Sequence, residues 1–451
     1  MRMACDDGER KEPKLLYLLD DGWRHEKRVI LDYLYERLPL RVITHDPATH
    51  AQLADEKDVR LLNVAPICKH FLYPLVLFFA SELDTVVTRR ERMLRLQTTG
   101  GWVQRMVHPF RELLGRIGLR RYRYEKALRF LYQHSSMYSD LWHAHNVLLF
   151  SPVGVLDKRV IFEAQAAGLK IICWVYSWDN PIKDNEFISD LDAYLVWNEG
   201  NRSDLVKWHG VDPAKVHVVG APQLDALIAR PPSQPRAGRS RYVLYPCATG
   251  RGVFMEQEVD LILWLRNLLD QIDPTVELLV RPYPFRKMSE GNPYDRLEGK
   301  VGVRIGHFGS AENGRIMMDA HAEEERYWQI HDAVCMINLG STIGLEAAYT
   351  STPVLQLAFC DIPEEAGVLS LRSVFENEHL CYLMNAKYPN VVKDSSSLSA
   401  ALREIFAGRV DPYRAYSKEL RRISDPLGGA CYKDVLCQTI AGLLKQWDDA
   451  N

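Results

Sequence analysis

The sequence predicts an α/β protein with two Rossmann-like, doubly wound parallel-sheet domains and a helical insertion in the N-terminal domain. Short apolar runs alternate with helical patterns along most of the chain, as expected for strands and helices that take turns. A Pro-, Arg- and Ser-rich stretch at 230–241 interrupts this alternation and is typical of a linker. The length of 451 residues also suits two domains, with a ligand cleft between them.

The N-terminal domain is expected to span residues 1–228. Its strands are apolar runs, each followed by a helical pattern: KLLYLL (14–19), LRVIT (40–44), VLLFS (147–151), KIICWVYS (170–177), AYLVW (193–197) and VHVVG (216–220). Helices are expected at about 24–38, 161–168 and 202–210. Gly220, at the end of the last run, is interpreted as clearance for a ligand near the hinge.

The C-terminal domain is expected to span residues 240–428. Its strands are YVLYP (242–246), VELLVRPYP (276–284), AVCMINLG (333–340) and PVLQLAF (353–359), with helices near 255–270 and 322–331. Residues 429–451 are predicted to form a C-terminal helix.

Composition excludes several classes of protein. The net charge of -3 provides no global field to attract nucleic acid. Nine cysteines are scattered without a CxxC or a His/Cys cluster, which indicates reduced thiols, a cytoplasmic setting and no structural zinc. The charged first residues do not resemble a signal peptide, and the longest apolar run, FLYPLVLFFA (71–80), is too short to span a bilayer.

The stretch NLGSTIGLEAAYTSTPVL (338–355) places Gly340, Ser341 and Thr342 between a strand and a short helix. Ligands of parallel sheets bind at this end of the strands, and the first N–H groups of a helix attract anions. The stretch therefore predicts a phosphate cradle. The alternative is a helix that Ser or Thr merely caps.

A second stretch, LLVRPYPFRK (278–287), ends a buried strand on Arg281 and adds two more cations after a Pro-x-Pro turn. A cation at this end of a strand suits the phosphates of a nucleotide. The alternative is a proline-kinked loop with solvated basic residues.

From Glu346-Ala347 to Pro353-Val354, the end of the cradle helix resembles the donor helix of GT-B glycosyltransferases. SWDNPIKDNE (177–186), VWNEGNRSDL (196–205), LLVRPYP and INLGSTIGLEAA occur in the order seen in bacterial surface-polysaccharide glycosyltransferases of the SWDN kind. The resemblance covers about 170–360. It implies that Glu346 holds the ribose hydroxyls and that the helix at 429–451 packs back towards the N-terminal domain, as the tails of GT-B enzymes do. Tyr283 replaces the histidine of the similar RPHP motif, which favours UDP- or GDP-sugars over CMP-sugars.

Polar and aromatic residues follow two strands of the N-terminal domain. Trp178 offers a flat face for a sugar ring, and Asp179 and Asn180 offer hydrogen-bonding groups. Glu199 follows the next strand and is a second candidate for binding sugar or acceptor. The alternatives are an Asx-type turn at 177–180 and a helix cap at Glu199.

An inverting glycosyl transfer needs a base for the acceptor hydroxyl. Asp21 and Asp20, at the end of the first strand, and His25, one turn on, are the candidates. The alternative is that the two aspartates cap the next helix, and the sequence leaves the stereochemistry open. The resemblance implies no metal and no cofactor, because a helix terminus and basic side chains stabilise the leaving phosphate.

The insertion at about 70–132 is strongly basic: residues 86–132 hold eleven Arg and one Lys against three Glu, a net charge of +9. Its apolar residues recur at helical spacing, which predicts binding to an anionic membrane surface. The alternative is a helical insertion packed on the N-terminal domain.

These observations predict a cytoplasmic enzyme, peripheral on the inner membrane face, that moves a sugar from a nucleotide-sugar to a surface glycan or lipid-linked acceptor. A nucleotide-sugar epimerase of the same fold, a polyol-phosphate transferase and a non-catalytic sugar-binding relative remain open alternatives.

Overall fold

The structure is a computed structural model. It describes residues 14–19, 25–62, 80–81, 109–110, 113, 122–123, 129, 138–142, 144–151, 158–183, 188, 190–230, 240–248, 252–282, 293–306, 310–312, 315–317, 319–359, 377–384 and 387–450.

The N-terminal part contains a seven-stranded sheet in the order β3-β2-β1-β6-β7-β8-β9, and every neighbouring pair of strands is parallel. Its central strands are buried on both faces, as parallel strands covered by helices must be. The strands are β1 (Leu15–Leu18), β2 (Leu40–Thr44), β3 (Val59–Leu61), β6 (Val147–Phe150), β7 (Lys170–Trp174), β8 (Ala193–Val196) and β9 (Val216–Val218).

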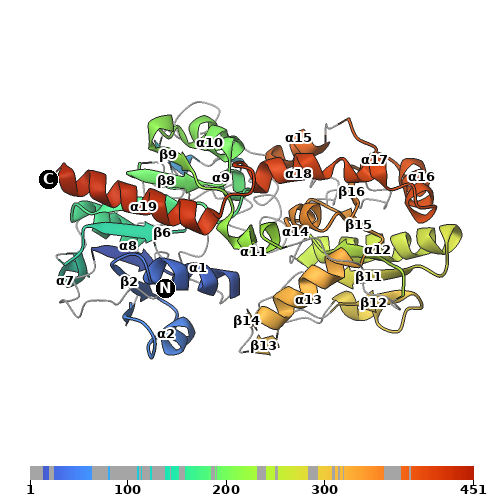
Figure 1. Ribbon diagram of the computed structural model, residues 1–451, viewed down its shortest axis with the longest axis horizontal. Coiled ribbons are helices and arrows are strands. Elements are labelled where there is room, and N and C mark those ends of the chain that lie inside the picture. Colours follow the sequence, from blue (N-terminus) through green and yellow to red (C-terminus); the bar gives the residue numbers. More distant parts are fainter. Residues whose placement is uncertain are drawn as a thin grey trace.

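Helices cover both faces of this sheet (Figure 1). They are α1 (His25–Tyr35), α2 (Pro47–Leu53), α7 (Ser139–Trp142), α8 (Arg159–Ala166), α9 (Asn180–Lys183), α10 (Glu199–Asp204) and α11 (Asp225–Ile228). A π-helical turn, Leu205–His209, continues α10 and ends where Gly210 adopts a left-handed backbone with a φ of 64°.

The C-terminal part contains a six-stranded sheet in the order β12-β11-β10-β15-β16-β17, again with parallel neighbours. Its strands are β10 (Tyr242–Pro246), β11 (Glu277–Arg281), β12 (Val303–Ile305), β15 (Cys335–Asn338), β16 (Val354–Leu357) and β17 (Val391–Val392). Its helices are α12 (Gly252–Ile272), α13 (Ala320–His331), α14 (Ile343–Glu346), α15 (Cys381–Met384), α16 (Ser395–Phe406), α17 (Asp411–Arg414) and α18 (Ser417–Ser424). The two sheets confirm the predicted pair of parallel-sheet domains.

The last helix, α19 (Tyr432–Asp449), lies against the N-terminal sheet, as Figure 1 shows in red. Its apolar side chains Leu436, Ile440 and Leu443 belong to the same core cluster as residues of β1, β2, β6, β7 and β8. At its far end Asp448 pairs with Lys14 at 2.8 Å. The chain therefore ends on the domain in which it begins.

The start of α19 is fixed by residues of the chain that leaves the N-terminal sheet. The Asp225 carboxylate accepts the backbone N–H groups of Tyr432 and Lys433, both at 2.8 Å, and so caps α19 from another helix. Gly220 has a φ of 74°, and a Cβ there would lie 1.9 Å from the Tyr432 ring. The interpretation of Gly220 as clearance for a ligand is therefore wrong: the Tyr432 ring fills that space.

The predicted insertion at 70–132 lies almost wholly outside the described residues, and its membrane-binding role stays a prediction. Within it the structure describes two short parallel strands, β4 (Ala80–Ser81) and β5 (Tyr122–Arg123). A small antiparallel pair, β13 (Ser310–Glu312) and β14 (Arg315–Met317), lies in the C-terminal part. None of the described helices combines the length and the apolar character that crossing a bilayer requires.

Candidate functional site

The turn after β15 is organised by Asn338. Its Oδ1 accepts the backbone N–H of Ser341 at 3.1 Å, and its Nδ2 donates to Gln356 at 3.0 Å. Gly340 takes a left-handed φ of 72°, which a residue with a Cβ adopts only at a cost. A Cβ at Gly344 would lie 2.5 Å from Asn338 Nδ2. Gly340 and Gly344 are therefore needed for the conformation and packing of the turn, whether or not a ligand binds there.

The helix after this turn is shorter than the sequence suggests. α14 spans four residues, Ile343–Glu346, and a 3-10 turn, Ala347–Tyr349, follows it. So short a helix carries a small dipole, because the dipole sums over aligned peptide groups. Any anion affinity of this turn must therefore come mainly from side chains and individual N–H groups.

Ser341 and Thr342 do not cap this helix through their side chains. Thr342 occupies the N-cap position but forms no side-chain capping bond. The backbone N–H of Ser341 is already used by Asn338, and its hydroxyl has no hydrogen-bond partner in the described part of the chain. The capping alternative left open by the sequence therefore does not explain the two hydroxyls.

Arg281 lies at the end of β11, in the same sheet, and is 7% exposed. Its Nη1 donates to Gln329 Oε1 on α13 at 2.8 Å. Burial, then the nearby cation of Arg326, lower the pKa of Arg281 to about 10. The carboxylates of Glu346 and Glu325 act in the opposite direction. Arg281 is therefore a cation at neutral pH, held inside the domain.

Glu346, predicted to hold ribose hydroxyls, is 6% exposed and forms an ion pair with Arg326 Nε at 3.0 Å. Arg326 is on α13, a helix whose facing residues the sequence did not single out. The structure therefore gives Glu346 a structural partner that competes with its predicted role.

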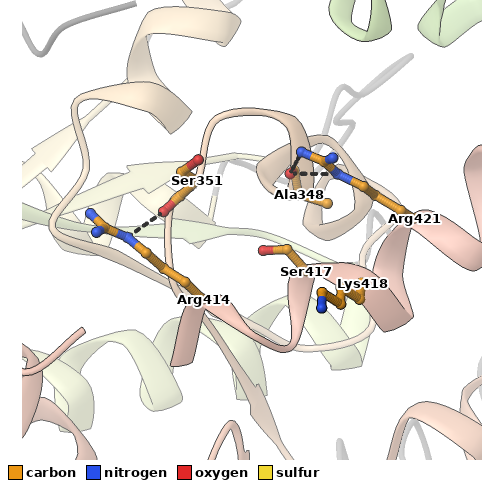
Figure 2. Close-up of a pocket in the computed structure, with 6 residues that line it drawn as sticks. All are labelled: Ala348, Ser351, Arg414, Ser417, Lys418 and Arg421. Atoms are coloured by element: carbon orange, nitrogen blue, oxygen red, sulfur yellow. Dashed lines mark hydrogen bonds between the residues drawn. The ribbon is translucent and has the colours of Figure 1, made fainter. Parts of the chain in front are cut away.

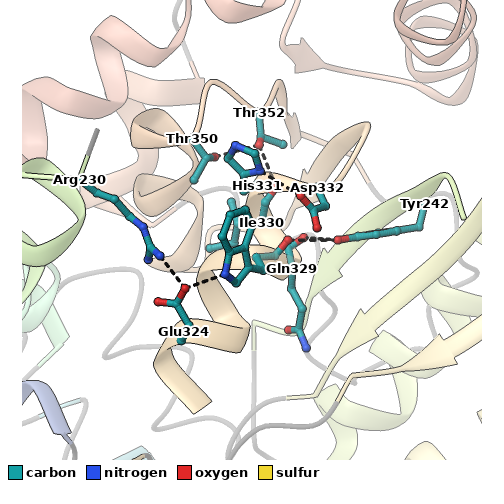
Figure 3. A network of polar contacts seen from close by, with 10 residues as sticks. Arg230, Tyr242, Glu324, Gln329, Ile330, His331, Asp332, Thr350 and Thr352 are labelled. Atoms are coloured by element: carbon teal, nitrogen blue, oxygen red, sulfur yellow. Dashed lines mark hydrogen bonds and ion pairs between the residues drawn. The ribbon is translucent and has the colours of Figure 1, made fainter. Parts of the chain in front are cut away.

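Hydrogen bonds from β10, from the segment before β16 and from the linker hold α13 in place (Figure 3). Its last carbonyls accept hydroxyl groups: Gln329 O from Tyr242 at 2.9 Å and Ile330 O from Thr352 at 2.8 Å. From the linker side, Arg230 pairs with Glu324 at 2.5 Å. Since α13 carries the charged Arg326 and Glu325 and the acceptor Gln329, these bonds position the groups around Arg281.

The two predicted motifs meet between the domains. The indole N–H of Trp178, shortly after β7, donates to Thr342 Oγ1 at 3.3 Å. The Trp178 ring is 4% exposed and meets the ring of His379 edge to face, with 4.7 Å between the centroids. In this arrangement the ring is an interdomain contact, and its face is covered rather than open to a sugar.

The other candidates on this side fall into two groups. Asp179 and Asn180 are buried, and Asn180 Oδ1 accepts the Ser177 N–H at 2.8 Å, while the Asn180 N–H donates to Ser177 O at 3.0 Å, a reciprocal pair that differs from the expected Asx-type turn, in which the side chain bonds two residues further on. Glu199 is the first residue of α10 and is exposed, with Arg202 at 3.5 Å. Neither observation tests sugar binding, so these assignments stay predictions.

Sequence reasoning overlooked two asparagines beside Glu199. Asn198 caps α10 and donates through Nδ2 to Ile423 O of α18 at 2.7 Å, which joins the domains. Asn201 Nδ2 donates to Trp178 O at 2.6 Å. The sequence signal for Asn198 was its position in the turn before a predicted helix, where an asparagine side chain commonly caps the first N–H groups.

Three candidates for the base and one for the donor have no described side chain. Asp20, Asp21 and Tyr283 lie outside the described residues; His25 begins α1, and the structure does not describe its side chain. Their roles stay predictions. No group of three or more His, Cys, Asp or Glu residues that could hold a metal ion occurs in the described ranges.

Two cavities of the described structure have none of the predicted site residues in their lining. One, of about 330 Å³, lies between the N-terminal sheet and α19 and includes Lys14, Trp142 and Trp447 in its lining. The other, of about 210 Å³, lies beside α17 and α18. Trp178 and Thr342 are in contact in this arrangement, so a ligand that binds the Thr342 hydroxyl has to displace the Trp178 indole.

Asp204, at the end of α10, is the candidate for a pH effect near this interface. Burial raises its pKa to about 6; Lys207 opposes the shift, and Glu378 of the other domain adds to it. The folded protein thus binds a proton more tightly than the unfolded chain, so stability falls as pH rises from about 4 to about 6.

We expect Asp204→Asn to be more stable than the parent at pH 8 by about 1–3 kcal/mol, because asparagine avoids the buried charge. At pH 4.5 the difference should shrink, because Asp204 is then protonated in the folded parent. Urea unfolding at both pH values measures this; an equal difference at both contradicts the assignment.

No protein-family model matches the chain, and no curated protein matches its sequence. Several solved structures are similar to it over nearly their full length. A putative UDP-N-acetylglucosamine 2-epimerase from Listeria monocytogenes has 10% identity and a TM-score of 0.49, with 98% of each chain covered. HepE of Anabaena, in complex with UDP and glucose, has 10% identity and a TM-score of 0.47, with 96% of this chain and 99% of that one covered. A UDP-GlcNAc 2-epimerase from Neisseria meningitidis bound to UDP-GlcNAc has 12% identity and a TM-score of 0.46, covering 95% and 99%. At these values the similarity identifies neither a family nor an activity for this chain.

Proposed function

We propose that this protein is a glycosyltransferase of the SWDN kind that moves a sugar from a nucleotide-sugar to a surface glycan or a lipid-linked acceptor. One observation carries the proposal: Trp178 of the SWDN stretch contacts Thr342 of the Gly-Ser-Thr turn across the two domains. Both stretches follow strands at the carboxyl ends, where parallel sheets bind ligands.

The donor side of the proposed site is the C-terminal domain. Arg281 supplies a fixed cation for the donor phosphates, and the hydroxyls of Ser341 and Thr342 are not used to cap α14. When the donor enters, Thr342 exchanges the indole of Trp178 for the phosphate. Glu346 shares its carboxylate between Arg326 and the ribose, and Tyr283 donates a hydroxyl.

The acceptor side is the N-terminal domain. In an inverting transfer, Asp21 takes the proton of the acceptor hydroxyl while that oxygen bonds to the anomeric carbon; Asp20 and His25 are the other candidates. The bond from the anomeric carbon to the phosphate oxygen breaks, and the leaving nucleotide carries the negative charge. Arg281 stabilises that charge, so the residues of this chain serve without a metal.

The experiment is a thermal-shift panel of UDP-, GDP-, CDP- and CMP-sugars, since a ligand that binds only the folded state raises Tm. We expect one nucleotide class, UDP or GDP, to raise it. Incubation of that donor without acceptor then separates the activities, because only an epimerase changes the sugar. A shift by CDP-polyols alone would indicate a polyol-phosphate transferase, and no shift with any donor contradicts nucleotide-sugar binding.

A further inference from the structure

A second site of concentrated positive charge lies beside α17 and α18. Arg414, Lys418 and Arg421 line a cavity of about 210 Å³, and the rest of the lining is Ala348, Ser351 and Ser417 (Figure 2). Arg414 ends α17, and Lys418 and Arg421, three residues apart, lie on the same face of α18, so the short turn between the two helices brings the three cations to one cavity. No acidic residue is in the lining.

The two arginines are held in place by backbone carbonyls rather than by acids. Arg421 donates through Nε and Nη2 to Ala348 O at 3.1 and 2.8 Å, and Arg414 donates through Nε to Ser351 O at 3.2 Å (Figure 2). These bonds fix the guanidinium groups through neutral carbonyl oxygens, and the Arg421 guanidinium also lies over the Tyr349 ring, 5.2 Å from its centroid. Preorganised cations of this kind bind anions at a smaller entropic cost.

Few acids balance this charge. Arg414 lies 3.8 Å from Asp411, whose side chain is 96% exposed, and such exposed pairs contribute little. Within the described part of the chain, neither Lys418 nor Arg421 forms an ion pair with an acid. Three neighbouring cations repel one another, and a bound anion would remove that repulsion.

The size of the cavity selects the kind of anion. A water molecule takes about 30 Å³ in the liquid, so the cavity of about 210 Å³ has room for roughly seven waters. Pockets for whole small molecules begin at about 300 Å³. The cavity therefore suits a phosphate or diphosphate group, which Arg and Lys bind through charge-assisted hydrogen bonds, better than a complete nucleotide-sugar.

We propose that Arg414, Lys418 and Arg421 form a binding site for a phosphoryl group, separate from the donor site. The group belongs to a soluble phosphorylated ligand or to a lipid headgroup, which present the same chemistry. None of the six lining residues is a predicted donor residue.

The test is a calorimetric titration of inorganic pyrophosphate into the parent and three variants. The Lys418 side chain forms no hydrogen bond or ion pair with the described residues, so we expect Lys418→Gln to remove one positive charge without changing the stability of the fold. We expect it to weaken binding about tenfold, the loss of one hydrogen bond to a charged group. The matched control is Arg422→Gln, which removes the same charge from a position on the same helix, where it pairs with Glu419 at 3.0 Å. It should bind like the parent.

Ser341→Ala is the third variant and reports on the donor site. Pyrophosphate binding that Lys418→Gln leaves unchanged and Ser341→Ala weakens belongs to the domain interface, and this result overturns the second site. Failure of the donor site has a different signature, in which Ser341→Ala has no effect and Lys418→Gln does.

Vesicles distinguish the two sources of the phosphoryl group. Sedimentation with phosphatidylglycerol vesicles, against phosphatidylcholine vesicles as a control, is compared for the parent and Lys418→Gln. Weaker sedimentation of the variant assigns the site to lipid headgroups; equal sedimentation with weaker pyrophosphate binding assigns it to a soluble ligand. If Lys418→Gln changes neither, the site does not exist.

Discussion

Replacing Gly220 by alanine is expected to lower the free energy of unfolding by about 2–5 kcal/mol, the sum of left-handed backbone strain and overpacking. The left-handed φ of 74° disfavours any residue with a Cβ. That Cβ would also meet the ring of Tyr432 at 1.9 Å, and Tyr432 is fully buried. Tyr432 is held at both ends, its N–H by Asp225 at 2.8 Å and its hydroxyl by Asp425 and the Leu427 N–H, so moving the ring aside breaks these bonds or shifts α19.

The matched control is Gly168→Ala. Gly168 has a φ of 87°, but a Cβ at this position would meet no described atom within 4 Å, so alanine adds strain without a clash. It should cost about 1–2 kcal/mol. Urea unfolding measures both. If both substitutions lower the free energy of unfolding by the same amount, the predicted clash between a Cβ at position 220 and the Tyr432 ring is contradicted.

Replacing Glu346 by glutamine is expected to cost about 3 kcal/mol of stability, the low end of the range for removing one partner of a buried ion pair. The side chains of Glu346 and Arg326 are 9% and 16% exposed, and the pair is 3.0 Å apart. Glutamine keeps the shape and loses the charge. The guanidinium of Arg326 then remains close to that of Arg281 without its carboxylate, so both cations lose a compensating charge.

The exposed pair of Glu199 and Arg202 provides the control, with side chains 71% and 37% exposed. Glu199→Gln should cost no more than about 1 kcal/mol. The double variant Glu346→Gln with Arg326→Gln should recover part of the loss, and the resulting cycle gives the coupling energy. If Glu346→Gln unfolds at the same urea concentration as Glu199→Gln, the pair makes no special contribution.

The alternation of apolar runs and helical patterns was enough to predict the central strands of both sheets, because parallel strands buried on two faces leave a strong signal, but it missed the short edge strands β3, β12 and β17. It also placed SWDN and the Gly-Ser-Thr turn at the carboxyl ends of strands, and the structure brings Trp178 and Thr342 together. The four-residue length of α14 did not follow from the pattern. In both an α-helical turn and a 3-10 turn, residues three apart in sequence lie on the same side, so a few apolar residues do not distinguish the two.

The sequence pattern did not predict contacts between residues that lie far apart in the chain. Arg326 pairs with Glu346 only because α13 docks with one particular face on the sheet. Gly220 faces Tyr432, more than two hundred residues later in the chain, because α19 returns to the first domain. Asn198 bonds to α18 for a similar reason. Such pairs depend on how elements pack in three dimensions, which a single sequence does not encode locally.

We propose that the turn after β15 binds the donor phosphate, and a calorimetric titration of the donor into Ser341→Ala tests this. The Ser341 hydroxyl has no partner in the described part of the chain, so alanine should leave the fold intact. Ser399→Ala, on α16, is the matched control; its hydroxyl donates only to Ser395 O at 2.8 Å. We expect Ser341→Ala to weaken donor binding about tenfold, or about 1.4 kcal/mol, and Ser399→Ala to bind like the parent. If both variants bind the donor as tightly as the parent, the turn is a structural feature only and the donor lies elsewhere.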